Sequence, residues 1–464
     1  MSNVPERIMG TEVEYAIHWV GKKDSSSTSQ ELFLASIPPG TLSIGEFLSN
    51  GARLYRDVGN HPEYATPECA GPLQATQYEI AGEQTVSALA QCMAARSGRL
   101  AVANKRLCDP RGNQWGSHHS FEVSRKLFSE VAQKTADPTY VQGLLVSHLA
   151  TNSIFAGSGM YLNSGGYRIS QKKWRTTSAI TSDTTREKGL INTRDESHSG
   201  GFSDKSARLH VQAGEATISP WATWMQLGTF SILLRVLENG WKVDVPLLEN
   251  AGQAASVVAQ DPSLSQVLKL RDGSGLTAVD IQAEYAALGQ KAKDAGMLSE
   301  QEEKVADSWS SVTEDLPRRD YVDCTDRIDW LCRQNFVELH AAKRLKDKQK
   351  LVQHKQEVDL VYDRLGPQGI GYKLRARGQY AMRFSDGEIA ELVQRPPNTR
   401  ARTRGEIIKY VAQRDFYQQD RRAFEINWDF VTIRGSRRRL GRARRYDPNL
   451  VALVCSQVDE MCSQ

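Results

Sequence analysis

The segment 50–68, with the sequence NGARLYRDVGNHPEYATPE, carries the side chains of this chain that are best suited to chemistry. Sixteen of its residues include Arg53, Asp57, His61, Glu63 and Glu68. The alternating run predicts an extended stretch. It ends in Gly-Asn-His-Pro, which predicts a turn in which proline fixes φ. Carboxylates on such a rigid element suit a metal-nucleotide site, although a polar surface loop can have the same composition.

A second acidic segment, MGTEVEYAI at 9–17, is predicted to be a strand. Residues two apart on a strand point to the same face, so Glu12 and Glu14 share one side while Val13 and Tyr15 take the other. Two neighbouring carboxylates repel each other, and a bound Mg²⁺, which prefers oxygen ligands, would remove that cost. A solvated sheet face explains the pair taken alone, but the second acidic segment at 50–68 favours a metal site.

The elements that must position these residues are indicated by periodicity and by breaker residues. Helical periods occur at 78–98, 127–152 with a break at Pro138, 218–239 ending at Gly240, 276–310 with a break near Gly296, and 340–365. We expect the helix at 218–239 to be buried and the one at 340–365 to be solvated. Pro396-Pro397 marks a boundary, after which a small module runs to the end.

The amino-acid composition is typical of an ordinary globular protein. The 464 residues are 40% hydrophobic and 25% charged, and no apolar run approaches the roughly 18 residues that span a bilayer. The stretch MSNVPERIMG lacks a signal-peptide core, so we expect a cytoplasmic protein without a membrane partner. Seven cysteines without CxxC spacing indicate reduced thiols.

The formal net charge of +4 is too small to indicate a nucleic-acid partner. Seven arginines nevertheless fall within residues 434–445. Such a block could bind phosphates or RNA, dock an acidic protein, or form a solvated basic loop.

Further motifs follow the first two along the chain: GTEVEY at 10–15, NGARLY-x-D-x-G-x-HPEYA-x-PE at 50–68, AGE at 81–83, INTRDE at 191–196, RLHV at 208–211, IDW at 328–330 and PPNTRARTRGE at 396–406. In this order they resemble the family of Pup–protein ligases and Pup deamidase/depupylases. The likeness covers nearly the whole chain, and the block at 50–68 is long enough to be highly specific.

The resemblance implies an α+β fold, with a curved antiparallel β-sheet cradle packed on helices, related to glutamine synthetase and the γ-glutamyl-cysteine ligases. We expect a glutamine synthetase-like catalytic domain at 1–395 and a small C-terminal domain at 396–464. The implied cofactors are ATP and Mg²⁺. The implied partners are a small, acidic, Pup-like protein modifier and lysine-bearing protein substrates, and whether a bacterial proteasome lies downstream stays open.

The resemblance also implies site residues: Mg²⁺ on Glu12, Tyr55 and Glu63, and ATP on Arg53, Thr66 and Trp428. A phenol is a poor Mg²⁺ ligand, so we expect Tyr55 to act through its backbone or a water molecule. The plain alternative for Trp428 is a core tryptophan. Arg194, Asp195, Glu196, Arg208 and His210 would support phosphate and carboxylate groups, or would form a structural ion-pair network.

Asp57 matches the catalytic aspartate of the family. In the ligases it acts as a base toward the incoming lysine, and in the depupylases as a nucleophile or an activator of water. A carboxylate with an ordinary pKa near 4 is a weak base for an ammonium group, but desolvation of the lysine lowers the pKa of its amine. A salt bridge to Arg53 or Arg56 is the structural alternative.

Departures from the family pattern fall at 105–107 and 116–121. The usual Gly-x-His-Glu-Asn-Tyr reads Gly-Ser-His-His-Ser-Phe here, so His119 and Ser120 replace a carboxylate and an amide. Lys-Arg-Leu stands at 105–107 in place of Lys-Asn-Asn. These changes put the contacts of that strand in doubt and leave an inactive adaptor as an alternative function.

Ligase and hydrolase features both occur. The EVEY of the first strand is closer to the deamidase/depupylase version. The 57–61 turn, the RAR-x-RGE at 400–406 and the short interval of 34 residues at 16–49 resemble the ligase. We therefore predict an ATP-dependent ligase that joins the C-terminal glutamate side chain of the modifier to lysines through a γ-glutamyl phosphate. The alternatives are a depupylase/deamidase that hydrolyses the isopeptide bond or a C-terminal Gln, and a small-molecule γ-glutamyl ligase.

Overall fold

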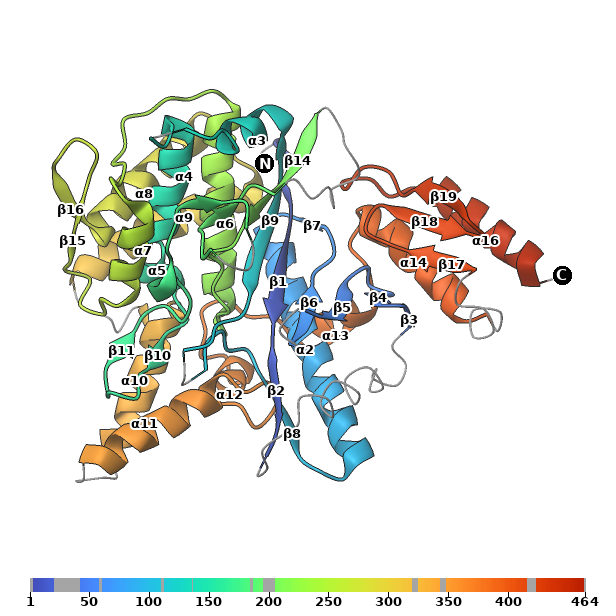
Figure 1. Cartoon of the computed structure of the whole chain (residues 1–464), viewed down its shortest axis with the longest axis horizontal. Coiled ribbons are helices and arrows are strands. Elements are labelled where there is room, and N and C mark those ends of the chain that lie inside the picture. Colours follow the sequence, from blue (N-terminus) through green and yellow to red (C-terminus); the bar gives the residue numbers. More distant parts are fainter. Residues whose placement is uncertain are drawn as a thin grey trace.

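A computed structural model describes residues 3–20, 42–57, 61–109, 112–135, 137–183, 187–194, 205–318, 324–342, 348–414 and 423–462 of the chain. Figure 1 shows a central sheet with a layer of helices on its left and a smaller module of helices and strands on its right.

The large sheet has ten strands: β1 (Ile8–Glu14), β3 (Ser43–Ile44), β4 (Phe47–Leu48), β5 (Arg53–Arg56), β6 (Pro62–Ala65), β7 (Cys69–Ala70), β9 (Ser117–Ser124), β12 (Ile180–Thr181), β13 (Ile191–Asn192) and β14 (Ser206–Val211). Their order is β12-β13-β14-β9-β1-β6-β5-β4-β3, with β7 pairing β1 outside this path. All pairs except the parallel β12–β13 are antiparallel. The α+β class with an antiparallel sheet packed on helices is confirmed, and the acidic strand β1 lies near its centre.

The helices that accompany this sheet are α2 (Pro72–Ser97), α3 (Arg125–Val131), α4 (Tyr140–Thr151), α5 (Ser153–Ala156), α6 (Pro220–Glu238), α7 (Ala251–Ala259), α8 (Ala278–Asp294), α9 (Glu300–Asp315), α10 (Asp329–Ala342), α11 (Lys348–Tyr362), α12 (Ile370–Ala376) and α13 (Asp386–Gln394). Single 3₁₀ turns are η1 (Lys173–Arg175) and η2 (Leu316–Arg318). Three small two-stranded sheets complete this part: β2 (Ala16–Trp19) with β8 (Ala101–Asn104), β10 (Met160–Tyr161) with β11 (Tyr167–Arg168), and β15 (Val267–Lys269) with β16 (Gly275–Thr277).

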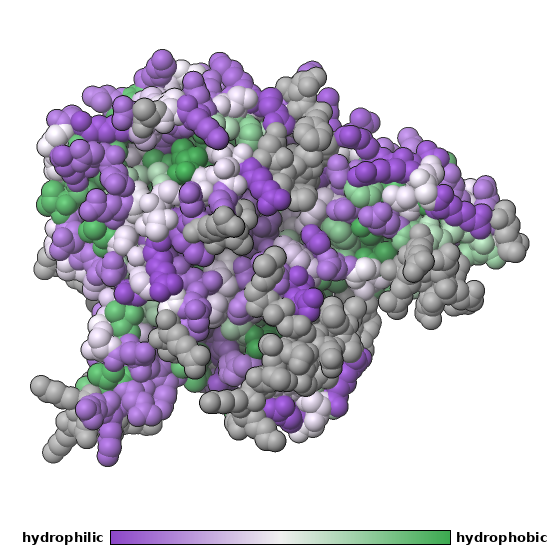
Figure 2. Space-filling view, viewed as in Figure 1, coloured by the Kyte–Doolittle hydropathy of each residue, from purple (hydrophilic) through white to green (hydrophobic). Residues whose placement is uncertain are grey.

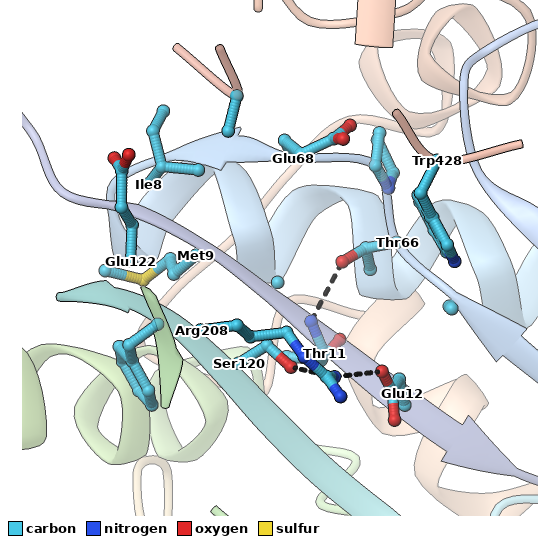
Figure 3. A pocket seen from close by; sticks show the side chains of 15 residues that line it. Ile8, Met9, Thr11, Glu12, Thr66, Glu68, Ser120, Glu122, Arg208 and Trp428 are labelled. Carbon is cyan, nitrogen blue, oxygen red and sulfur yellow. Dashed lines mark hydrogen bonds and ion pairs between the residues drawn. The ribbon is translucent and has the colours of Figure 1, made fainter. Parts of the chain in front are cut away.

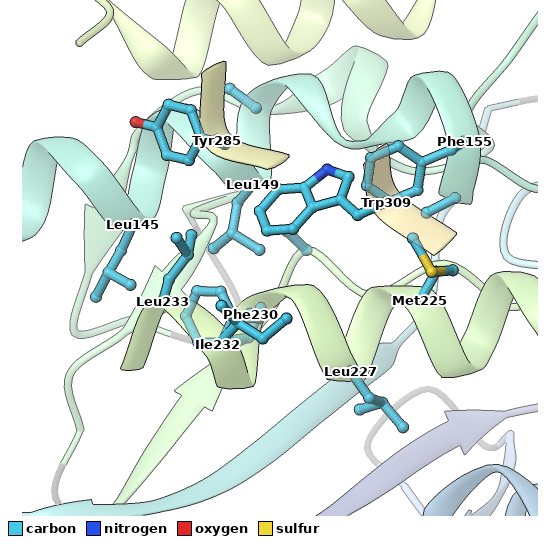
Figure 4. Close-up of a cluster of buried hydrophobic side chains, with 14 of the residues drawn as sticks. Leu145, Leu149, Phe155, Met225, Leu227, Phe230, Ile232, Leu233, Tyr285 and Trp309 are labelled. Carbon is cyan, nitrogen blue, oxygen red and sulfur yellow. The ribbon is translucent and has the colours of Figure 1, made fainter. Parts of the chain in front are cut away.

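The main hydrophobic core lies between the sheet and helices α4 to α9. The predicted buried helix at 218–239 is confirmed as α6, along which almost every side chain is buried. Figure 4 shows Trp309 of α9 surrounded by apolar side chains such as Phe155 and Leu149. Its indole Nε1 donates to Gln282 Oε1 at 3.0 Å, which satisfies the polar atom of a fully buried ring.

Two predicted helix breaks are confirmed. Pro138 separates α3 from α4, and Thr139 caps the second helix by accepting from Gln142 N while the Gln142 side chain accepts from Thr139 N. Gly296 lies between α8 and α9 at φ 67°, a conformation that favours glycine.

Two sequence predictions differ from the structure. The strand expected at 9–17 is two strands, because the chain leaves the large sheet after Glu14 and β2 pairs with β8 instead. The helix expected to be solvated, seen as α11, is buried at its end, where Asp359 and the following Asp363 pair with Arg106 and Arg333. Residues that form ion pairs across a buried interface are polar, so the sequence of such a helix resembles that of a solvated helix.

The C-terminal module comprises α14 (Arg400–Ala412), β17 (Phe424–Ile426), β18 (Phe430–Ile433), β19 (Ser436–Arg439) and α16 (Pro448–Cys462). Its three strands form a separate antiparallel sheet in the order β17-β18-β19. Its apolar core also takes in Ile44 and Phe47 from the edge of the large sheet. The domain division at 396 stays a prediction.

The described helices include none with the length and apolar character needed to cross a membrane. Figure 2 shows a face dominated by hydrophilic residues, with smaller hydrophobic areas between them.

Candidate active site

One face of the large sheet carries polar side chains from several strands. Glu14 of β1 lies opposite Glu63 of β6, and Glu63 lies opposite Tyr55 of β5. Glu12 lies opposite His118 of β9. Cross-strand partners project to the same side, and the same alternation places further side chains on this face: Arg53, Ser120, Arg208 and His210. The opposite face packs on the hydrophobic core.

A cluster of three carboxylates forms the acidic part of this face. Oxygen atoms of Glu14, Asp57 and Glu63 lie within 4.8 Å of one another. Tyr55 donates its phenolic hydrogen to Glu63 Oε1 at 2.6 Å. Burial, and then the charge of Glu12, raises the pKa of Glu63 well above its usual range. Burial and the charge of Asp57 raise the pKa of Glu14 to about 7. A cation would relieve this cost by stabilising the ionised carboxylates.

Glu12 belongs to a neighbouring cluster with two histidines. Its Oε2 lies 3.6 Å from His118 Nδ1, and its Oε1 lies 3.3 Å from Arg208 Nη1. Burial favours protonation, but the hydrogen bond with His118 and the charges of His210 and Arg208 hold the pKa of Glu12 well below its usual range. Burial lowers the pKa of both histidines. Donor atoms of Glu12, His118 and His210 lie within 4.8 Å of one another.

The donor chemistry fits a divalent cation at both clusters. The oxygen-only set around Glu63 suits Mg²⁺, and the mixed set around Glu12 also suits softer ions. The predicted metal residues Glu12 and Glu63 therefore lie in different clusters on the same sheet face. Tyr55 is placed to orient Glu63 through a hydrogen bond, in keeping with an indirect role toward a metal. These metal assignments stay predictions.

Two pockets include Glu12 in their lining. The first contains the carboxylate cluster, and the second extends toward the C-terminal module (Figure 3). Thr66, which follows β6, accepts a hydrogen bond from Thr11 N at 2.9 Å. Gly10 permits this approach, because a Cβ there would lie 2.9 Å from Thr66 Oγ1. Arg208 also points to this pocket.

Trp428 lines the same pocket from the loop between β17 and β18. Its ring meets Phe47 edge-on at 5.1 Å between centroids, and the guanidinium of Arg404 lies 4.8 Å from the ring centroid. The core and the pocket interpretations of Trp428 therefore both describe its position. Its predicted contact with ATP stays a prediction.

Arg53 is not one of the described residues that line either pocket, and its predicted contact with ATP stays a prediction. Its guanidinium pairs with Glu46 Oε2, at 3.0 Å from Nε, and lies 4.1 Å from the ring centroid of Tyr55. The structural alternative of an Arg53–Asp57 salt bridge is therefore wrong for this conformation, and Asp57 instead faces the carboxylate cluster.

Basic side chains line the same pocket as the carboxylates Glu14, Asp57 and Glu63. Lys172, Lys188 and Arg194 line it. The Lys172 ammonium donates to Ser117 O at 2.8 Å, and burial lowers the pKa of Lys172 to about 7. Neither lysine was predicted, because 172 and 188 lie in irregular sequence outside every motif. Arg194 was predicted, and its motif neighbours Asp195 and Glu196 lie outside the described residues.

The two departures in β9 fall on different faces. His119 lies opposite Thr11, is 4% exposed and packs edge-on to Phe121, so it belongs to the side of the sheet away from the carboxylates. Ser120 lies on the site face, where its hydroxyl accepts from Arg208 Nη1 at 3.1 Å. Only the second departure changes a group that lines a pocket with Glu12.

Comparisons with known proteins agree on one family. The family model described as Pup-ligase protein matches residues 35–432. A curated Pup–protein ligase of Acidimicrobium ferrooxidans is 31% identical over 434 residues, which cover 90% of this chain and 92% of that protein. The Pup–protein ligase of Mycobacterium tuberculosis strain H37Ra is 30% identical, with 91% of this chain and 92% of that protein covered.

Two solved structures share the fold. A crystal structure of the complex between the prokaryotic ubiquitin-like protein Pup and its ligase PafA matches 99% of this chain and 95% of that chain, with a TM-score of 0.82 and 24% identity. A structure of the Pup ligase PafA in complex with ADP matches 97% and 96% of the two chains, with a TM-score of 0.74 and 24% identity. With the family model and the curated relatives, these matches show that the chain belongs to the Pup-ligase family.

Proposed function

We propose that this chain is an ATP-dependent ligase that joins the C-terminal glutamate side chain of a Pup-like modifier to lysines of protein substrates. The observation that carries the proposal is the single sheet face on which two adjoining pockets meet at Glu12. The curated relatives named Pup–protein ligases support the reaction. A C-terminal glutamate, a nucleotide and a lysine must come together for it, and this face offers distinct surroundings for each.

The first step needs ATP and a carboxylate in contact. The adenine would lie beside Trp428 and the phosphates would point along β1 toward Glu12, which borders both pockets. Mg²⁺, held by Glu12 and by Glu63 with Tyr55 as its hydrogen-bonded support, would neutralise phosphate charge. Lys172, together with Lys188 and Arg194, would hold carboxylate groups of the modifier's terminal glutamate. The glutamate γ-carboxylate then takes the γ-phosphate, and ADP is released.

The second step forms the isopeptide bond. Asp57 lies at the end of β5, beside Glu14 and Glu63, where it can accept a proton from the incoming lysine ammonium. The neutral amine attacks the carbonyl carbon of the γ-glutamyl phosphate, a C–N bond forms, and the C–O bond to phosphate breaks. The remaining ammonium proton leaves with phosphate or solvent. Exclusion of water from the pocket lowers the pKa of the amine and makes a carboxylate an adequate base.

The experiment is an intact-mass assay with the purified chain, Mg-ATP, a modifier ending in Glu and a lysine-bearing acceptor. A conjugate that is lighter than its two components by one water, formed only with ATP, supports the proposal. Ammonia loss from a Gln-ended modifier, or cleavage of a pre-made conjugate without synthesis, would instead support a depupylase/deamidase. Products with free amino acids would support a small-molecule ligase, and failure to bind Mg-ATP would support an adaptor.

The proposal extends to the setting of the enzyme. We place it in the cytoplasm, with residues 1–395 as the catalytic domain and 396–464 as the C-terminal domain, and with its products directed to a bacterial proteasome. Comparing the lifetime of a conjugated acceptor in cells with and without proteasome activity tests the last point, because equal lifetimes would contradict it.

A further inference from the structure

The segment 434–445, called here the arginine segment, contributes to neither pocket through its arginines. It runs through β19 and the following loop and carries seven arginines and no carboxylate. Six of them are exposed: Arg434, Arg437, Arg439, Arg442, Arg444 and Arg445. Figure 2 shows hydrophilic residues along the upper rim of the C-terminal module, where Figure 1 places β18 and β19.

Carboxylates among the described residues balance only part of the positive charge of this segment. Arg444 lies 3.7 Å from Glu122 Oε2 of β9 and donates to Glu6 O. These contacts fix the C-terminal end of the arginine segment to the large sheet. Across the described ranges, no carboxylate oxygen lies within 4.0 Å of the guanidinium nitrogens of Arg437 or Arg439. Like charges on neighbouring positions repel one another, so a polyanionic partner would lower their energy.

β19 is also an edge strand. In the part of the chain that the structure describes, it pairs with β18 alone. Leu440 N donates to Asp429 O at 2.7 Å, and the next opposed pair is Arg439 with Phe430. Hydrogen-bonded and non-hydrogen-bonded pairs alternate in an antiparallel ladder. The N–H and C=O groups of Arg439 and Arg437 therefore point away from β18, toward the open edge.

The local conformation presents these side chains outward. Arg437 stacks on Phe430, with its guanidinium carbon 3.5 Å from the ring centroid, and both it and Arg439 lie on the sheet face opposite the buried Val431. The hairpin turns at Arg434, at φ 45°, and the following glycine. Arginine in this left-handed region is strained where Asn or Gly is ordinary, and such strain is typical of functional positions.

We propose that the open edge of β19 binds an acidic, extended peptide segment of a partner protein as a fourth strand. The peptide backbone would pair with the outward N–H and C=O groups, and carboxylates at alternate positions would meet Arg437 and Arg439. A nucleic acid could use the charge but not the strand edge. Phe430 on the neighbouring strand β18 is covered by Arg437, so this ring face is not available to stack on a base of a single strand.

The test uses the full chain and a fluorescein-labelled peptide of twelve residues with alternating Glu and Thr, followed by anisotropy at low salt. We expect saturable binding that weakens as salt is raised, and no binding of a Lys-Thr peptide. Arg437→Glu with Arg439→Glu should weaken binding at least about tenfold. Arg96→Glu, an exposed charge reversal at the end of α2, should leave it unchanged.

A matched pair separates strand addition from charge alone. Arg439→Ala and Arg439→Pro lose the same charge, but only proline loses the outward N–H, which an edge strand tolerates. We expect the proline variant to bind at least about threefold more weakly than the alanine variant, with equal thermal stability as the folding control. In the unmodified chain, the peptide should slow hydrogen exchange of the Arg437 and Arg439 amides.

Three results would overturn the proposal: equal affinity of the two Arg439 variants, unchanged exchange of the β19 amides at peptide saturation, or binding of a single-stranded RNA oligonucleotide by a chain that does not bind the acidic peptide. None of these readouts depends on ligase activity, so failure of the ligase proposal would not affect them.

Discussion

Glu68 joins the loop after β6 to the C-terminal module, and its removal is the sharpest test of how the module is held. Its Oε1 accepts from Arg400 Nη2 at 2.7 Å and its Oε2 accepts from Arg404 Nη2 at 2.6 Å. Both arginine side chains are 0% exposed. Arg404 also contacts the pocket that Trp428 lines, because its Nη1 donates to Trp428 O at 2.8 Å. Glu68→Gln would leave two buried guanidinium groups without their carboxylate.

Two lines of reasoning give a similar magnitude. Breaking a buried ion pair by removing one partner costs about 3–5 kcal/mol. Burial favours protonation, but the charges of Arg404 and Arg400 lower the pKa of Glu68 from 4.5 to about 2. At 1.36 kcal/mol per unit, this depression corresponds to about 3 kcal/mol. For Arg404, burial lowers the pKa and the charge of Glu68 opposes that shift.

The sign of the pH dependence follows from the depressed pKa. The contribution of Glu68 is fully present above about pH 4.5, and it is lost as the pH falls through the window from 4.5 to about 2. We therefore expect Glu68→Gln to lower the urea midpoint strongly at neutral pH. The difference between wild type and variant should shrink as the pH falls below 4.5.

Urea unfolding followed by tryptophan fluorescence measures this difference. Glu249→Gln is the matched control, because its pair with Lys269 is 50% and 65% exposed and should contribute less than about 1 kcal/mol. A Glu68→Gln midpoint equal to that of Glu249→Gln, or a difference that grows toward low pH, would show that the buried Glu68 carboxylate does not stabilise the fold through its arginine pairs.

Three further predictions concern the pockets. Trp428→Ala should raise the KM for ATP about tenfold with a smaller change in kcat, since base–aromatic stacking contributes about 1–3 kcal/mol; an unchanged KM would remove the adenine from this pocket. Tyr55→Phe should raise the Mg²⁺ concentration for half-maximal activity at least about tenfold, as loss of a supporting hydrogen bond weakens metal ligands, and a metal titration of activity measures it. Lys172, charged below its pKa of about 7, should hold the modifier less well as the pH rises above 7. The KM for the modifier should therefore rise above pH 7 in the wild type, and this rise should be smaller in Lys172→Arg. An equally steep rise in the variant would contradict the role of Lys172.

The sequence predicted the elements whose physics is local. Alternation placed Glu12 and Glu14 on one face of a strand, and Pro138 and Gly296 marked real helix breaks. The extent of the first strand was too long, because nothing local to Glu14 signals that the next residues pair with β8. Tertiary structure decides which strands pair, and short local sequence patterns do not contain that information.

The site was predictable where a motif carried it. Asp57 and Glu63 came from the specific block at 50–68, and the structure brings their carboxylates together with Glu14. Lys172 could not be found, because a lysine in irregular sequence has the same signature whether it is solvated or held by a carbonyl such as Ser117 O. The prediction that α11 is solvated was wrong at the end of that helix for a related reason, since sequence does not show whether an acidic side chain faces water or a buried arginine.

The central claim is that Asp57 serves as the base of an ATP-dependent ligation. The most direct measurement is the intact-mass assay on Asp57→Asn beside Asp294→Asn, an exposed aspartate at the end of α8 that serves as the control. Nucleotide binding is followed on the same samples. We expect Asp57→Asn to bind Mg-ATP like wild type but to form almost no conjugate, and Asp294→Asn to form it normally. Conjugation at the wild-type rate by a folded Asp57→Asn chain would contradict that role of Asp57.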